Sequence, residues 1–229
     1  MNICVIPARG GSKRIPKKNI RNFHGQPIIA YSIQSAINSG CFEKVIVSTD
    51  DPEIAAVALE FGADVPFERP AEISDDHATT VDVIQHVIGW CESQGWQIDN
   101  LCCVYATAPF LTSEDLIQGL NLLEDQDINY VFSAASFSFP IQRGFYLDEV
   151  GEVVMFQPQH INTRSQDLRE AYHDAGQFYW GKLPAFKVGL PFFGKHSKPV
   201  FISRERVQDI DTLEDWEYAE KLFQIVTHE

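Results

Sequence analysis

Short apolar runs alternate with helix-like patterns along most of the chain. The runs 3–6, 45–47 and 101–105 have the length of buried strands, and 130–134 has a similar, β-like composition. Between the first two runs, isoleucines at 29, 33 and 37 recur with the spacing of one helix face. This alternation predicts βαβ units and therefore an α/β fold, a mostly parallel sheet flanked by helices.

Further helices are predicted from the residues that begin and end them. Asp, Thr or Ser stands at the start of each segment, where its side-chain oxygen can accept hydrogen bonds from the first free backbone N–H groups. On this basis helices are expected at about 51–62, 79–91, 112–124 and 212–226.

Residues from about 137 to 200 break the alternation. Prolines at 140, 158, 184, 191 and 199 are scattered among glycines and aromatic residues. We predict a small inserted lobe, serving dimerisation and ligand binding, within a single domain that spans 1–229. The pair Phe192-Phe193 is too short for a helix face, so it either folds back onto the core or is buried by a partner chain.

The composition supports one sizeable core. The 229 residues are 45% hydrophobic and 12% aromatic, which excludes a disordered or fibrous chain. The five cysteines are odd in number and have no C-x-x-C spacing, so buried thiols in a reducing, cytoplasmic compartment are expected. No apolar run approaches the roughly 18 residues of a membrane span, and no membrane partner is predicted.

Charge is distributed unevenly along the chain. The formal net charge is −14, yet residues 1–42 contain six Lys or Arg and no Asp or Glu. An acidic protein repels nucleic acid unless its cations form an extended basic face, and here they occupy one short segment. The sequence therefore favours a small anionic ligand over a nucleic acid, and a non-catalytic nucleotide- or RNA-binding protein is the less favoured alternative.

The segment 7–19 carries most of these cations. It leaves the first apolar run, turns through Gly10 and Gly11, and continues through several lysines and arginines. A glycine turn with cations at the carboxyl end of a parallel strand is suited to hold phosphate oxygens. It matches neither the Walker A pattern nor the dinucleotide-binding glycine pattern.

The same segment resembles the P-A-R-G-G-S-K-x-I-P-x-K-N motif of the acylneuraminate cytidylyltransferase family. Further similarities lie at 47–50, 68–72 with Thr79-Thr80, and 209–212, in the family's order. The resemblance implies a Rossmann-like nucleotidyltransferase fold. It also implies an enzyme that joins CMP from CTP to a nonulosonic acid, a nine-carbon α-keto sugar acid, and releases pyrophosphate.

Roles on the nucleotide side follow from this resemblance. Arg9, Lys13 and Asp211 are the implied catalytic residues. The implied nucleotide-binding residues are Arg9, Gly10, Gly11, Ser12, Lys13, Lys18, Asn19, Arg69, Thr79 and Thr80.

Asp209 and Asp211 flank Ile210, so in an extended segment both carboxylates point to one face and can grip a divalent cation. The resemblance implies that this ion is Mg²⁺. The alternative is helix capping, because Asp211 with Glu214, or Thr212 with Asp215, has capping-box spacing.

On the sugar side, 102–110, 140–143 and 164–181 resemble the branch of the family that activates pseudaminic acid. The implied sugar-binding residues are Tyr105, Thr107, Gln142, Arg143, Arg164, Gln166, Gln177 and Tyr179.

Several alternatives stay open on this side. Tyr105 stands where sialic acid activators have glutamine, but it is equally an ordinary core aromatic. His173 beside Asp174 is a structural pair or a proton shuttle. Activation of sialic, legionaminic or 3-deoxy-octulosonic acid is the alternative function. A homodimer is expected, with flagellin or a surface polysaccharide as the final destination of the sugar.

Overall fold

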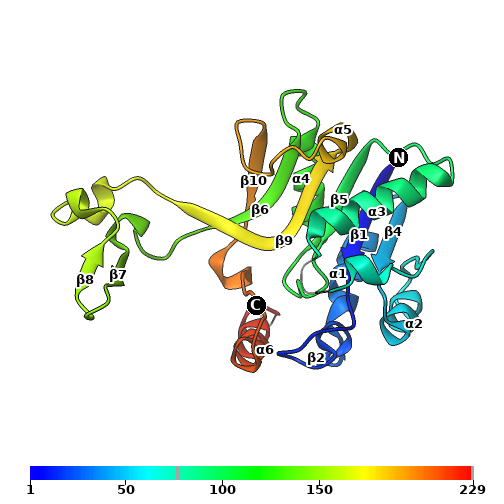
Figure 1. The fold of residues 1–229 in the computed structure, drawn as a ribbon, viewed down its shortest axis with the longest axis horizontal. Coiled ribbons are helices and arrows are strands. Elements are labelled where there is room, and N and C mark those ends of the chain that lie inside the picture. The colour runs from blue at the N-terminus through cyan, green and yellow to red at the C-terminus, as the bar shows by residue number, and fades with distance from the viewer. Residues whose placement is uncertain (76–77, 228–229) are drawn as a thin grey trace.

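A six-stranded sheet forms the centre of the protein, in the order β10-β6-β9-β5-β1-β4 (Figure 1). The computed structural model describes residues 1–75 and 78–227. The strands of this sheet are β1 (Asn2–Pro7), β4 (Lys44–Ser48), β5 (Asn100–Val104), β6 (Tyr130–Ser136), β9 (Tyr172–Lys182) and β10 (Ser197–Phe201). Only β9 runs antiparallel to its neighbours among these described strands. The prediction of a mostly parallel sheet is confirmed.

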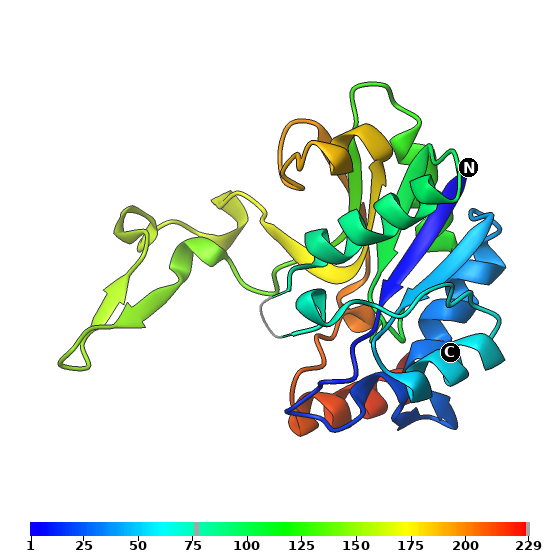
Figure 2. The ribbon, with the colours of Figure 1, turned by 45° about the vertical axis from the view of Figure 1, so that its right-hand side comes forward.

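Helices cover both faces of this sheet (Figure 2). Helices α1 (Ile28–Ser39), α2 (Pro52–Glu60) and α4 (Ser113–Leu123) contribute apolar side chains to one core, and α3 (Thr80–Ser93) and α5 (Leu183–Lys187) contribute to the other. Three of them begin at a predicted cap. The Asp51 side chain accepts from two backbone N–H groups, and Thr79 and Thr112 each form a complete capping box.

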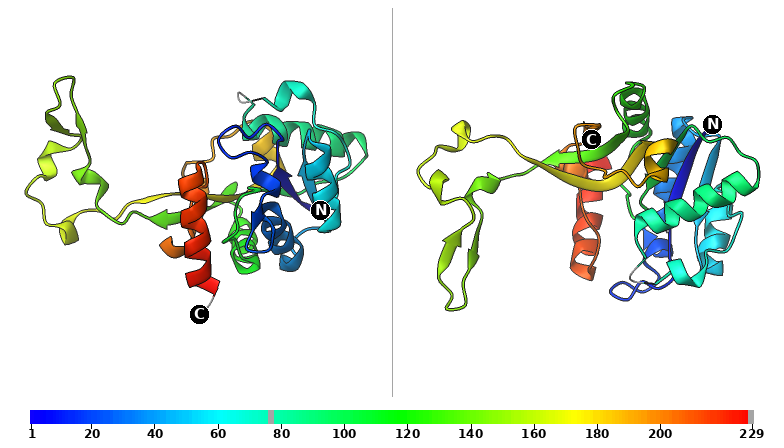
Figure 3. Two further views of the ribbon diagram at one scale, coloured as in Figure 1. Left: turned by 90° about the horizontal axis from the view of Figure 1, so that it is seen from below. Right: turned by 45° about the horizontal axis from the view of Figure 1, so that its top comes forward.

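The C-terminal helix α6 (Leu213–Thr227) lies beyond the carboxyl ends of the parallel strands, below the sheet in Figure 1 and toward the viewer in the left view of Figure 3. Trp216 on this helix is buried and packs edge to face against Phe23, with ring centroids 5.5 Å apart. Phe23 lies in a small hairpin of β2 (Asn22–Phe23) and β3 (Gln26–Pro27). This aromatic contact brings the end of the chain beside the basic N-terminal segment.

Residues 137–171 project from the body as an arm (Figure 1). The arm contains a hairpin of β7 (Phe145–Leu147) and β8 (Val153–Met155). It is shorter than the predicted lobe, because 172–201 supplies β9, α5 and β10 to the body. Of the prolines of that stretch, Pro184 lies in the first turn of a helix and Pro199 in an edge strand, two positions that need no backbone N–H. The short 3-10 helices of the chain are η1 (Lys18–Ile20), η2 (Ala71–Ile73), η3 (Ile141–Arg143), η4 (Pro158–His160), η5 (Ser165–Asp167) and η6 (Arg204–Arg206).

The pair Phe192-Phe193 folds back onto the body. Phe192 packs on Tyr130 and Tyr179, with ring centroids 4.8 and 5.1 Å away. Phe193 is more exposed but contacts Phe132 edge to face. In the single chain, the pair therefore folds back onto the core, which is the first of the two predicted alternatives.

All five cysteines are free thiols, and four of them are buried, as predicted. Burial raises the pKa of Cys103 to about 12 and that of Cys91 to about 11, which keeps both thiols protonated at neutral pH. Within the described part of the chain, no helix combines the length and the apolar character needed to cross a bilayer.

Candidate active site

Two adjoining cavities open at the carboxyl ends of the central strands. The loop cavity, about 530 Å³, lies between the N-terminal segment, the start of α3 and the residues that follow β5. The β9 cavity, also about 530 Å³, lies between the residues that follow β5, the middle of β9 and the segment 207–209. Tyr105 and Thr107 line both cavities, so the two lie side by side.

Most of the predicted nucleotide-binding residues meet in the loop cavity. Those that line it are Arg9, Ser12, Lys13, Lys18, Asn19, Arg69, Thr79 and Thr80. The turn at Gly10 and Gly11 connects them without lining the cavity itself.

The first peptide group of the glycine turn is held from two sides. The Gly10 N–H donates to the Asp50 carboxylate at 3.0 Å, and Asn19 Nδ2 donates to the Arg9 carbonyl at 3.0 Å. A Cβ atom on Gly10 would lie 2.6 Å from Asp51 Oδ2, so this position favours glycine, whereas one on Gly11 would meet nothing within 4 Å. Protein contacts therefore hold the start of the turn, and the cations Arg9 and Lys13 on either side of it line the cavity.

The basic segment also meets the C-terminal acidic segment. Arg14 Nη2 donates to the Asp211 carboxylate at 2.9 Å, and Lys18 Nζ lies 3.3 Å from the same carboxylate. Lys18 Nζ also donates to the Ile210 carbonyl at 2.7 Å. Residues nearly 200 positions apart thus form one wall of the loop cavity, and Asp211 lines it.

Arg69 lies deep in the loop cavity. Its side chain is 4% exposed, its guanidinium donates to Asp50 at 3.4 Å, and its Nε has no protein partner. Burial lowers the pKa of Arg69, and the charge of Asp50 partly opposes this. A buried guanidinium with an unused donor is stabilised by any ligand that brings acceptor oxygens or ring carbonyl groups.

The two candidate metal ligands flank Ile210, a buried residue. Ile210 is buried against Trp216, so Asp209 and Asp211 stand on either side of it. Helix capping does not use the Asp211 carboxylate, because Thr212 pairs with Asp215 through N–H contacts of 2.8 and 3.2 Å. Burial first, and the charge of Asp211 second, raise the pKa of Asp209.

These carboxylates fit a hard divalent cation, since oxygen ligands suit Mg²⁺. Among residues 1–75 and 78–227, no cluster of three or more His, Cys, Asp or Glu side chains would hold a metal alone. The pair therefore fits an ion whose remaining ligands come from water or from a bound phosphate.

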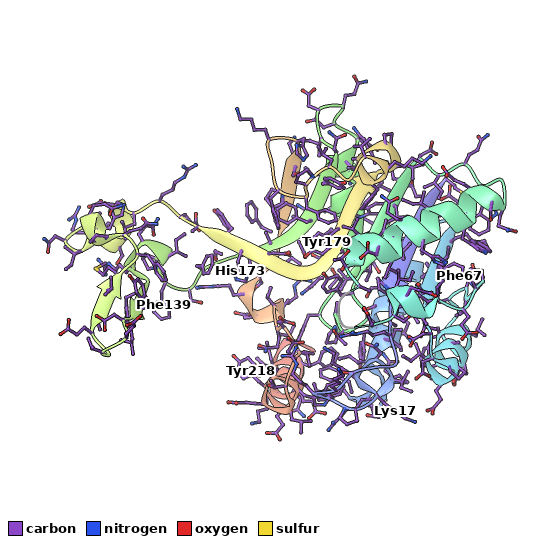
Figure 4. The ribbon with its side chains drawn as sticks, in the orientation of Figure 1. Lys17, Phe67, Phe139, His173, Tyr179 and Tyr218 are labelled. Carbon is purple, nitrogen blue, oxygen red and sulfur yellow. The ribbon has the colours of Figure 1, made fainter. Side chains whose placement is uncertain are left out.

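The predicted sugar-binding residues divide into two groups. Tyr105, Thr107, Gln177 and Tyr179 line the β9 cavity. Gln142, Arg143, Arg164 and Gln166 belong to the arm, which carries Phe139, whereas Tyr179 lies in the body (Figure 4).

Within the single chain, three of these side chains form hydrogen bonds to other residues of the arm. Arg143 donates to the Thr163 carbonyl at 2.6 Å, and Arg164 Nε donates to Asp167 at 3.0 Å. Gln142 Nε2 donates to the Arg169 carbonyl at 2.8 Å. One copy of the chain does not bring them to either cavity.

Sequence reasoning assigned no role to Asp50, which contacts both Gly10 and Arg69. Asp50 could have been found from its position in the chain. It stands two residues after the end of β4, at the carboxyl edge of the sheet, where α/β proteins place ligand contacts. Arg206 was also missed. It forms a two-point ion pair with Asp115, and only folding shows that the two residues meet.

Comparison with known proteins identifies the family. The profile of the family described as Cytidylyltransferase matches residues 3–225. A pseudaminic acid cytidylyltransferase of Campylobacter jejuni is 47% identical over 228 residues, covering 100% of this chain and 98% of that protein. A post-translational flagellin modification protein B of Campylobacter coli is 32% identical, covering 96% of this chain and 94% of that protein.

Among solved structures, a CMP:2-keto-3-deoxy-manno-octonic acid synthetase complexed with CTP superposes with a TM-score of 0.71 at 18% identity. The match covers 97% of this chain and 98% of that one, and it shows the same fold. The family resemblance predicted from sequence is confirmed. The chain belongs to the cytidylyltransferase family.

Proposed function

We propose that this enzyme transfers CMP from CTP to pseudaminic acid and releases pyrophosphate. The observation that carries the proposal is the loop cavity, where an acid-free basic segment faces Asp211. The 47% identical Campylobacter jejuni relative supports pseudaminic acid as the acceptor.

The loop cavity is the proposed CTP site. Arg9, Ser12, Lys13 and Lys18 bind the triphosphate oxygens, while Arg69 binds on the cytosine and ribose side. Cations held in place before the reaction neutralise charge that builds up on the phosphates in the transition state. We assign this catalytic role to Arg9 and Lys13.

The reaction exchanges one oxygen–phosphorus bond for another. The anomeric hydroxyl of the sugar acid attacks the α-phosphorus and loses its proton to the surrounding water, the α–β phosphoanhydride bond breaks, and pyrophosphate leaves with the bonding electron pair. Asp209 and Asp211 are the residues that would hold Mg²⁺, which when bound lowers the negative charge of the phosphates. Lys18 and Arg14 contact Asp211 and position its carboxylate at the cavity wall.

The β9 cavity is the proposed acceptor site, with Tyr105, Thr107, Gln177 and Tyr179 as sugar contacts. Its described lining includes Asp174 and Asp209 but no Lys or Arg. A sugar acid carries a carboxylate, which is stable in such surroundings only beside a cation. We infer that a cation from outside this lining contributes to binding the sugar carboxylate.

We propose that a second copy of the chain supplies it. The arm exposes large apolar side chains, among them Phe139 at 82% and Val150 at 80%, which an isolated arm leaves in water. In a homodimer that buries this surface, Arg143 and Arg164 of the second copy would reach the sugar carboxylate as planar two-pronged donors. Sedimentation equilibrium at micromolar concentration tests the dimer.

One experiment tests the proposed reaction. The purified enzyme is incubated with CTP and, in turn, pseudaminic, sialic, legionaminic and 3-deoxy-octulosonic acid, and pyrophosphate release is recorded with EDTA and Mg²⁺ add-back as the control. Pseudaminic acid should give the highest kcat/KM. A higher value with any other sugar acid would contradict the proposed substrate.

We further propose a cytoplasmic enzyme whose product serves glycosylation of flagellin or a surface polysaccharide, following its Campylobacter coli relative.

A further inference from the structure

Strand β9 is irregular where it passes the β9 cavity. Its register with β6 shifts between Phe132 and Ala134, and Gly176 has a φ of 62°, a left-handed conformation that favours glycine. The Ser133 hydroxyl accepts from the Gln177 N–H at 3.1 Å, in place of a ladder carbonyl. Bulges of this kind turn side chains out of the regular alternation, often beside active sites.

The bulge turns Asp174 back toward Tyr179. The Gly176 N–H donates to Asp174 Oδ1 at 2.8 Å, and the Tyr179 hydroxyl donates to the other carboxylate oxygen. His173, labelled with Tyr179 in Figure 4, precedes Asp174 in the chain. The His173 Nδ1 atom contacts the Asp174 backbone carbonyl at 2.9 Å, and its ring packs on Phe137. The Asp174 carboxylate is held from the side of Tyr179.

Tyr179 lies between Asp174 and the loop cavity. Its ring packs on Tyr105, with ring centroids 5.7 Å apart, and Tyr105 lines both cavities. The tyrosine that donates to Asp174 is therefore held in place by a residue shared by the two cavities.

Asp174 retains capacity for a ligand. A carboxylate has about four lone-pair positions, and the two donors named above occupy two of them. The residue lines the β9 cavity together with Asp209. The cavity wall at this point therefore offers acceptors for N–H or O–H groups and repels a carboxylate.

We propose that Asp174 is a specificity-determining residue of the acceptor site, whose carboxylate accepts a hydrogen bond from an N–H or O–H substituent of the sugar acid. The inference rests on the proposed function. It goes further by fixing which end of the sugar lies against β9: the donor substituents face Asp174, and the sugar's carboxylate faces away from it. Tyr179 acts as the positioning residue that orients Asp174.

The test compares three single variants. Asp174→Asn keeps the turn to Gly176 but removes the charge, so the KM for the sugar acid should rise about 10- to 100-fold, as expected for the loss of a charged hydrogen bond. The KM for CTP should stay within about twofold. Tyr179→Phe should raise the sugar KM by a smaller factor. Asp125→Asn is the matched control, since Asp125 forms the same turn to the N–H two residues on but lies on an exposed loop.

A double variant of Asp174 and Tyr179 distinguishes a loss of sugar recognition from general structural damage. If Tyr179 acts through Asp174, the sugar KM of the double variant should rise by less than the product of the single increases. An analogue of the sugar acid lacking one N–H or O–H donor at a time should identify the group bound. For the analogue lacking that group, the parent enzyme and Asp174→Asn should have similar KM values.

Three results would overturn the inference. These are a sugar KM unchanged in Asp174→Asn, an equal increase in the CTP KM, or additive effects in the double variant. The parent enzyme's turnover decides the proposed function separately. If it uses a different sugar acid, the proposed substrate is wrong and the variants are measured with the acid that is used; if it uses none, both proposals fail.

Discussion

The ion pair between Arg206 and Asp115 connects the segment 207–211, which we propose binds Mg²⁺, to the body of the enzyme. The two guanidinium nitrogens of Arg206 donate to the two oxygens of Asp115 at 2.6 and 2.9 Å. Asp115 is almost fully buried and also accepts from the Thr112 hydroxyl at the start of α4. The Arg206 carbonyl accepts from Gln177 Nε2 at 2.5 Å. Arg206 therefore supports both the segment 207–211 and the lining of the β9 cavity.

Replacing Arg206 by Met removes the cation while keeping much of the side-chain stem. Breaking one partner of a buried ion pair costs about 3–5 kcal/mol, because a buried charge is left uncompensated. Here the Thr112 contacts still stabilise the Asp115 carboxylate, so we expect a loss of about 3 kcal/mol in the free energy of unfolding. We also expect a higher Mg²⁺ concentration for half-maximal rate, because the segment that carries Asp209 loses its anchor.

Urea unfolding followed by circular dichroism measures the first effect, and a Mg²⁺ titration of the rate measures the second. Lys198→Met is the control. Lys198 pairs with Asp125 at 2.8 Å on the surface, where such a pair contributes less than about 1 kcal/mol. If Arg206→Met lowered the unfolding free energy no more than this control, the reasoning about the buried pair would be refuted.

Three further predictions concern single groups. Asp211→Asn should raise the Mg²⁺ concentration for half-maximal rate at least about tenfold, and an unchanged titration would contradict its role as a ligand. Gly10→Ala places a Cβ 2.6 Å from Asp51, so CTP titration should show at least about a fivefold higher KM and a smaller change for Gly11→Ala; equal effects would argue against the close contact. Burial first, and a nearby positive charge second, lower the pKa of His86 from 6.5, so the folded state favours the neutral ring and the free energy of unfolding should fall as the pH drops below about 6.5. His86→Gln should remove that part of the pH dependence in urea unfolding at pH 5 and 7.5, and an identical dependence would show that another group is responsible.

Much of the fold is predictable because its signals are local. The apolar run 3–6 falls within β1, Thr79 and Thr112 cap the helices that they were predicted to cap, and Thr212 pairs with Asp215 as a capping box. The glycine turn after β1 is also a local pattern, so the sequence placed the anion-binding segment at the carboxyl edge of the sheet. The acid-free composition of 1–42 strengthened that interpretation.

Features that depend on distant partners were not predictable in the same way. The residues of β9 do not show a regular strand pattern along the chain. The strand is stabilised by pairing with β5 and β6 on both sides, and it is interrupted by the bulge at Gly176. The ion pair of Arg206 likewise joins segments about 90 residues apart. The proposed action of Arg143 and Arg164 in a second chain is likewise a contact that the sequence of one chain does not show.

Strand β9 passes from the base of the arm into the middle of the sheet over eleven residues, without a loop between the two. A hydrogen-bonded ribbon of this kind is stiff along its length, and it yields most easily where its ladder is broken. That break lies between Asp174 and Tyr179. A displacement of the arm would therefore change the backbone first at the bulge, next to the side chains that line the β9 cavity.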